Sequence, residues 1–121
     1  MLAENEWVFT ARGGLIEKKY VWGNDESVAR DYANYTGIDG KDKWGYCTLV
    51  GSFKPNGYGL YDMSGNSWEL CQNWYDSSQR YHVFRGGSWG SSAYYFPVDR
   101  RIIAHRNGTE LSGFRCVAGL K

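Results

Sequence analysis

Residues 55–69 read PNGYGLYDMSGNSWE and join a turn-rich segment to a regular strand. Pro55-Asn56-Gly57 and Ser64-Gly65-Asn66 are typical turn sequences, because proline fixes φ while glycine and asparagine tolerate a positive φ. Over 67–75 the residues at 68, 70 and 72 alternate with those at 69, 71 and 73, which is the period of a β-strand. The stretch therefore predicts a strand that starts directly after an ordered turn.

Toward the C-terminus the same alternation of short apolar runs and turns continues. We expect a polar turn over 76–80, a strand at His82–Arg85, and a tight turn over 86–89, where two adjacent glycines allow close backbone approach. A third strand is predicted at 100–104. Asn107-Gly108 predicts a hairpin-type turn, and 113–118 a closing strand.

Toward the N-terminus the apolar pattern changes to a helical period that is never sustained for long. Residues 4–12 predict a helix that ends at Gly13-Gly14. We expect an extended piece at 20–22, a brief helix over 26–32, and a long ordered loop over 36–56. The predicted class is α+β, with few helices, short strands and much ordered loop.

Length and composition exclude several classes of protein. The 121 residues suit a single domain, residues 1–121, and 17% aromatic residues exclude a disordered chain. The net charge of +1 argues against nucleic acid or an anionic membrane as a partner. No apolar run is long enough to span a membrane, and the polar start does not read as a signal peptide.

The three cysteines, Cys47, Cys71 and Cys116, follow no metal-binding spacing. An odd number leaves at least one free thiol in a monomer. Two interpretations stay open: all three are small buried apolar side chains, or two of them form one structural disulfide.

Six blocks of sequence together resemble the formylglycine-generating enzyme, or sulfatase-modifying factor, family. They are Glu6-Trp7, Arg12-Gly13-Gly14, Trp22-Gly23-Asn24, the stretch 55–69, the block RGGSW at 85–89 and the block GFRCV at 113–117. The resemblance covers nearly the whole chain in order. It implies a fold similar to the C-type lectin fold, with twisted antiparallel strands.

Domains of this family are usually about twice as long, so the chain resembles their C-terminal portion. The stretch that precedes Glu4 in such domains is normally a substantial subdomain. We therefore expect this domain to be N-terminally short, and to be part of a longer chain or a homo-oligomer.

The resemblance does not extend to the family's catalytic residues. Formylglycine-generating enzymes are copper-dependent oxidases that hold Cu(I) with a cysteine pair located after the RGGSW-like block, and Cu(I) requires such soft thiolates. No cysteine lies between Cys71 and Cys116, and residues 90–99 read GSSAYYFPVD. We expect no copper and no parent activity. The alternative is an enzyme of the same family that has part of its site elsewhere, with Cys71 or Cys116 reactive.

The resemblance also implies two structural calcium sites, built from side-chain oxygens and backbone carbonyls. Calcium takes such mixed sets of hard oxygen ligands. The first set falls on Asn34, Tyr35, Asp42 and Trp44, and the second on Asp62, Gly65, Ser67 and Glu69. The competing interpretation is that Asp62 and Glu69 only cap turns.

The segment 89–112 mixes aromatic rings with guanidinium groups, which are the side chains enriched at recognition hot spots. Its candidate ligand-binding residues are Trp89, Ser91, Ser92, Tyr94, Tyr95, Phe96, Arg100, Arg101, His105 and Arg106. The alternative is that Tyr94 and Phe96 belong to the core and the arginines form a solvated face.

In the arrangement of its sequence blocks, the chain is similar to the variable proteins of diversity-generating retroelements. These are ligand-binding proteins of phages and bacteria. The predicted function is therefore non-catalytic recognition of a protein or glycan, on a bacterial cell surface or a virion. A structural or assembly domain, as found fused to kinases and motility proteins, is a further alternative, and without a recognition role the protein is expected in the cytoplasm.

Overall fold

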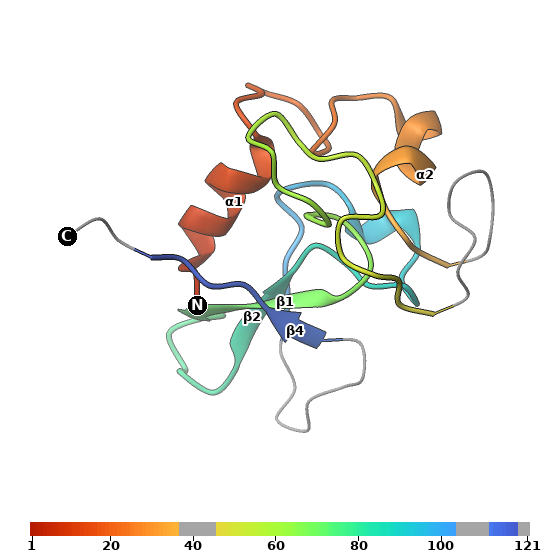
Figure 1. Ribbon diagram of the computed structural model, residues 1–121. Helices are drawn as coiled ribbons and strands as arrows, with labels where there is room; N and C mark the ends of the chain where they lie inside the picture. Colours follow the sequence, from red (N-terminus) through yellow and green to blue (C-terminus); the bar gives the residue numbers. More distant parts are fainter. Residues whose placement is uncertain (37–45, 104–111, 119–121) are drawn as a thin grey trace.

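The computed structural model describes residues 1–36, 46–103 and 112–118. Irregular but hydrogen-bonded loops connect short elements (Figure 1). The helical elements are α1 (Glu4–Arg12), the 3₁₀ turn η1 (Glu26–Val28), α2 (Ala29–Tyr32) and the 3₁₀ turn η2 (Ala93–Tyr95). The strands are β1 (Trp68–Trp74), β2 (His82–Arg85), β3 (Ile102–Ile103) and β4 (Ser112–Phe114). These elements confirm the predicted α+β class.

The four strands form one sheet in the order β3-β2-β1-β4. β1 pairs with β2 in antiparallel register, with Leu70 opposite Phe84, and an irregularity separates Cys71 from Trp74. β2 also pairs with β3 in antiparallel register. The expectation of antiparallel strands is wrong for β4, which runs parallel to β1 with Glu69 opposite Gly113.

The predicted ends of the C-terminal strands need correction. β4 ends at Phe114, and residues 115–118 are not strand. β3 and β4 lie at opposite edges of the sheet, so the strands on either side of Asn107-Gly108 do not form a β-hairpin. The reason is that β4 pairs with the edge of β1 that β2 leaves free. The dipeptide itself lies outside the described residues.

Helix α1 ends as its glycines predict. Gly13 adopts the left-handed conformation with φ of 58°, and its N–H bonds to the carbonyl of Thr10. A Cβ at Gly13 would lie 2.7 Å from the backbone nitrogen of Gly57, so glycine is also required for close approach. The helix buries Trp7 and Ala11. The C-cap thus connects α1 to the turn at 55–57.

Of the other N-terminal predictions, the long loop over 36–56 lies outside the described residues at 37–45. The brief helix predicted over 26–32 is present as η1 followed by α2. The piece at 20–22 does not join the sheet, because Tyr20 forms only a local bridge with Gly23. Among the described residues, no helix is long and apolar enough to cross a membrane.

The main core lies between α1 and the sheet. It contains the buried side chains of Leu2, Trp7, Ala11, Val21, Met63, Cys71, Val83 and Val98. A second group, Tyr20, Ala33 and Phe96, lies under the segment after β2. Trp68 and Phe84 form a third, on the sheet. The two smaller groups support the loops that carry the candidate site.

Candidate functional site

The segment that follows the RGGSW block is fixed by backbone hydrogen bonds. The N–H of Trp89 donates to the carbonyl of Asn66 at 3.0 Å, and the N–H of Thr36 donates to the carbonyl of Ser91 at 2.9 Å. The N–H of Ser88 donates to Oγ of Ser91 at 3.0 Å. Two distant parts of the chain, at positions 36 and 66, and one local bond therefore hold the start of this segment in one conformation.

Phe96 anchors the middle of the segment in the second core group. It is 2% exposed and meets the ring of Tyr35 edge-on, with the centroids 4.9 Å apart. A Cβ at Gly87 would lie 2.9 Å from Cε1 of Phe96, so glycine at position 87 makes room for this ring. Phe96 and Ser91, both predicted as ligand-binding residues, are buried. They belong to the scaffold, and the core interpretation of Phe96 is correct.

The end of the segment is held by a buried arginine. Nη1 of Arg85 donates to the carbonyls of Val98 and Arg100 at 3.0 and 3.1 Å. Its Nε and Nη2 donate to one carboxylate oxygen of Glu4, at 3.0 and 2.7 Å. Arg101 donates to both oxygens of Glu4 at 2.9 Å. Arg101, also predicted to bind ligand, is therefore engaged in fixing α1 to this segment.

Other predicted side chains of the segment are at least partly exposed, although Tyr95 also packs edge-on against Trp68. Tyr94 is 61% exposed, Ser92 is exposed, and Trp89, Tyr95 and Arg100 are partly exposed. The guanidinium carbon of Arg100 lies 4.2 Å from the centroid of the Tyr94 ring. His105 and Arg106 lie outside the described residues. The predicted binding residues therefore divide into buried supports and exposed rings with an arginine.

The structure adds Tyr46, which the sequence reasoning missed. Its ring is 72% exposed and meets Trp89 edge-on at a centroid distance of 4.9 Å. In the sequence, Tyr46 is an aromatic residue in a polar loop, and no pattern connects it to position 89. We define the recognition surface as Tyr46, Trp89, Ser92, Tyr94, Tyr95 and Arg100.

The residues predicted to hold calcium contain two buried oxygens without a partner. Among the described residues, Oδ1 of Asn34 and Oδ1 of Asp62 are the buried side-chain polar atoms that accept no hydrogen bond. Nδ2 of Asn34 donates to the carbonyl of Tyr46 at 2.7 Å, which fixes the orientation of the amide. Each orphan oxygen is the leading side-chain ligand of one predicted site. Such atoms are costly without a donor or a cation, so this feature fits calcium.

Asp62 sits in a conformation that few residues adopt. Its φ is 58°, and its Oδ2 accepts the N–H of Gly51 at 2.9 Å. The next turn is equally constrained, because a Cβ at Gly65 would lie 2.4 Å from the carbonyl oxygen of Asn34. The carbonyl of Gly65 accepts the N–H of Ser67 at 2.8 Å. The turn at 62–67 therefore brings parts of both predicted sites together.

Glu69 already has strong partners within the chain. Nε and Nη2 of Arg115 donate to its two carboxylate oxygens at 2.9 and 2.6 Å, and Nε1 of Trp7 donates at 2.7 Å. Burial on its own lowers the pKa of Arg115, but its hydrogen bonds and charge contact with Glu69, together with Asp62, raise that pKa above the ordinary value. Glu69 fits calcium less well than Asp62, because an ion would have to share its oxygens with Arg115.

The other predicted ligands are unevenly placed. The carbonyl of Tyr35 accepts Nη1 of Arg30 at 3.1 Å. Asp42 and Trp44 lie outside the described residues. The described residues contain no group of three or more His, Cys, Asp or Glu side chains that could hold a metal. Any ion here would depend on backbone carbonyls as well as carboxylates.

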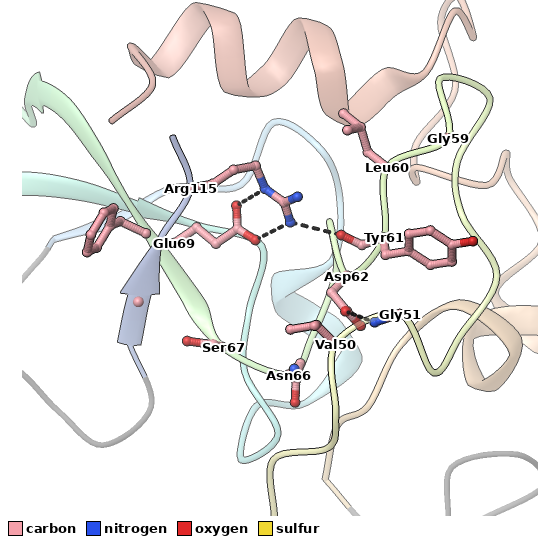
Figure 2. Close-up of a pocket in the computed structure, with 12 residues that line it drawn as sticks. Val50, Gly51, Gly59, Leu60, Tyr61, Asp62, Asn66, Ser67, Glu69 and Arg115 are labelled. Carbon is pink, nitrogen blue, oxygen red and sulfur yellow. Dashed lines mark hydrogen bonds and ion pairs between the residues drawn. The ribbon is translucent and has the colours of Figure 1, made fainter. Parts of the chain in front are cut away.

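Asp62, Glu69 and Arg115 face a hollow of about 550 Å³. Figure 2 shows Arg115 between Glu69 and the backbone of Tyr61, whose carbonyl accepts Nη2 at 2.8 Å. The rim includes the exposed side chains of Val50 and Phe114. The hollow lies beside the β1–β4 edge of the sheet, and none of its lining residues belongs to the recognition surface.

The cysteines are three free thiols in different environments. Cys71 is buried, and its pKa is raised to about 12, mainly by burial, with Glu4 and Glu69 adding to the shift. It is a small core residue, as one interpretation held. Cys47 and Cys116 are exposed, so that interpretation is wrong for them.

Comparison with known families identifies the chain. The family model for the sulfatase-modifying factor enzyme 1-like domain matches residues 1–120. The chain belongs to this family. The identification from six sequence blocks is thereby confirmed.

Individual relatives show the same likeness at different lengths. The chain is 34% identical to serine/threonine-protein kinase pkn1 of Chlamydia pneumoniae, over 97% of the chain and 20% of that protein. It is 35% identical to inactive C-alpha-formylglycine-generating enzyme 2 of Bos taurus, over 96% of the chain and 42% of that protein. The chain thus spans less than half the length of each.

The solved structure of Treponema denticola variable protein 1 has the same fold. The two superpose with a TM-score of 0.82 and 32% sequence identity, over 94% of this chain and 45% of that one. The predicted formylglycine-generating-enzyme-like fold is confirmed. Its likeness to the C-type lectin fold stays a prediction.

Proposed function

We propose that this domain is a non-catalytic recognition domain of the sulfatase-modifying factor family, which binds a protein or glycan through the surface of segment 89–112. One observation carries the proposal. Between 89 and 101, the backbone is held by buried hydrogen bonds and by Phe96, while rings and a guanidinium group point to solvent. The similarity to a variable protein supports it.

The physical advantage of this arrangement is preorganisation. A ligand that binds a fixed surface does not have to order a loop, which otherwise costs binding free energy. Tyrosine and tryptophan supply large contact areas with few rotatable bonds. Tyr94, Trp89 and Tyr46 are therefore the expected contributors to affinity, whereas Ser91 and Phe96 only hold the segment in place.

We propose calcium as a structural ion of the same scaffold. Asn34 and Tyr35, with Asp42 and Trp44, would hold one ion, and Asp62, Gly65, Ser67 and Glu69 a second. The orphan oxygens of Asn34 and Asp62 support this assignment. A bound ion would connect the turn at 62–67 to the chain around position 34, beneath the recognition surface. No copper is expected, because the family's cysteine pair is absent from the sequence.

The alternative, a formylglycine-generating-enzyme-type oxidase, has less support. Its chemistry needs reactive thiolates, and burial with a pKa of about 12 keeps Cys71 protonated at neutral pH. Cys116 is exposed, but it lies after β4 and outside the segment where the family's pair is expected.

The test uses arrays of bacterial surface proteins and of glycans, probed with the purified chain. Each hit is then measured by biolayer interferometry with Tyr94→Ala and with Phe9→Ala, an exposed aromatic on α1. We expect Tyr94→Ala to weaken binding at least about tenfold, as hot-spot residues do, and Phe9→Ala to leave it unchanged. No hit on either array, or equal loss with both variants, would contradict the proposal.

A further inference from the structure

Arg100 is the one charged side chain of the recognition surface, and its guanidinium carbon lies over the ring of Tyr94. Its Nε donates to the carbonyl of Tyr94 at 3.2 Å, and its Nη1 donates to the Tyr94 hydroxyl at 3.4 Å. Its backbone is fixed at both ends, because its N–H donates to Pro97 and its carbonyl accepts Arg85. The guanidinium group is thus positioned before any ligand arrives.

The charge of Arg100 has no counter-charge within the described residues. Arg85 and Arg101 both bind the carboxylate of Glu4, and Arg115 binds that of Glu69. Arg100 donates only to the neutral carbonyl and hydroxyl of Tyr94. Asp99, its neighbour in sequence, forms no ion pair with it in the described part of the chain. The described residues thus leave this partly exposed cation without a carboxylate partner.

The donors that remain have the geometry of a carboxylate site. A guanidinium group has five N–H donors in one plane. Nε uses one and Nη1 another, so three remain, including one on Nη1 and both on Nη2. The edge formed by Nη1 and Nη2 can donate two parallel hydrogen bonds, which match the two oxygens of a carboxylate.

The kind of side chain beside Arg100 favours a protein over a small sugar. Small ligands are usually bound in concave sites, whereas protein partners bind open surfaces with aromatic and arginine anchors. Tyr94, which is 61% exposed, supplies such an anchor beside Arg100.

We infer that Arg100, stacked on Tyr94, binds an aspartate or glutamate carboxylate of a protein ligand. This inference rests on the proposed recognition function and adds the chemistry of the partner. Arg101 has no such role, because the carboxylate of Glu4 is already its counter-charge. Arg100→Lys keeps the charge but removes the pair of parallel donors on Nη1 and Nη2. We therefore expect this variant to retain the binding only in part.

The test uses two capped hexapeptides, one with two glutamates between tyrosines and the other with glutamines in their place. Binding is followed by ¹⁵N NMR of the arginine Nε–H groups. We expect the glutamate peptide to shift the Arg100 resonance and to bind about tenfold more tightly than its glutamine twin, since hydrogen bonds to a charged acceptor are the stronger ones. The control Arg80→Gln, at an exposed arginine outside the surface, should change nothing.

Equal binding of the two peptides, or shifts that leave Arg100 unchanged, would overturn the inference. Binding of the glutamate peptide that survives Arg100→Gln would also overturn it. A ligand from the arrays that needs Tyr94 but tolerates Arg100→Gln would remove the carboxylate contact and leave the recognition function intact. A carboxylate-dependent shift at Arg100 without any array ligand would support the contact and count against the function.

Discussion

The turn at 62–69 and the segment at 89–101 use polar side chains in opposite ways. In the turn, Asp62 and Glu69 are buried, and their known partners, Gly51, Trp7 and Arg115, lie within the chain. In the segment, the backbone hydrogen bonds and the buried ring of Phe96 supply the support, while Ser92 and Tyr94 face solvent. Stability and recognition therefore depend on different side chains. The exposed ones can change without loss of the fold, and the following predictions test that separation.

The largest effect is expected at Glu69. Glu69→Gln keeps the shape of the side chain but leaves the Arg115 guanidinium, which is only 26% exposed, without its counter-charge. Breaking such a pair should lower the free energy of unfolding by about 3 kcal/mol, as measured by urea denaturation. Asp99→Asn, at an exposed carboxylate, should change it by less than about 0.5 kcal/mol. Equal effects would show that the turn is not the more sensitive region.

Removal of calcium is expected to act on the same region. An ion present at 100 times its Kd stabilises the folded state by about 2.7 kcal/mol, so excess chelator should lower the melting temperature. Asp62→Ala and Asn34→Ala should each reduce this response to chelator, while Tyr94→Ala should retain it. A melting curve that is the same with calcium and with chelator would remove both proposed sites.

A smaller effect is expected from alkaline pH. Because the pKa of Cys71 is raised from 9.0 to about 12 on folding, this thiol contributes stability that is fully present below pH 9 and is lost as the pH rises toward 12. Between pH 9 and 10 the wild type should lose about 1 kcal/mol more than Cys71→Ala. Parallel pH profiles for the two proteins would mean that the buried thiol is not shifted.

The smallest effect on stability is expected at the recognition surface. Tyr94→Ala removes a ring that is 61% exposed, and it should change the free energy of unfolding by less than about 0.5 kcal/mol. The same variant should abolish most binding. Gly87→Ala offers a matched contrast, because its methyl group would press on Phe96 and lower stability. If Tyr94→Ala destabilised the fold as much, the ring would be part of the scaffold.

The helices and strands were predicted better from the sequence than the pairing of the strands in the sheet. The helix at 4–12 and the strands at 68–74 and 82–85 follow from local periodicity and from glycine caps, which are readable along the chain. The parallel pairing of β4 with β1 depends on contacts between residues more than 40 positions apart. No local pattern encodes such a pairing.

The candidate site shows the same limit. Composition indicated rings and arginines over 89–112, but it could not separate exposed Tyr94 from buried Phe96, since both are aromatic. Glu4 lies far from Arg101 in sequence, so the ion pair between them, which engages Arg101 within the chain, was not predictable. Tyr46 joins the surface through contacts with residues distant in sequence, because its carbonyl accepts Nδ2 of Asn34 and its ring meets Trp89.

Two displayed libraries test the separation of scaffold and surface most directly. One randomises Ser92, Tyr94, Tyr95 and Arg100, and the other randomises Asn34, Asp62, Asn66 and Glu69, with resistance to protease as the measure of folding. We predict that most members of the first library stay resistant and include binders to new protein targets, while most members of the second are cleaved. Equal cleavage of the two libraries would contradict the account.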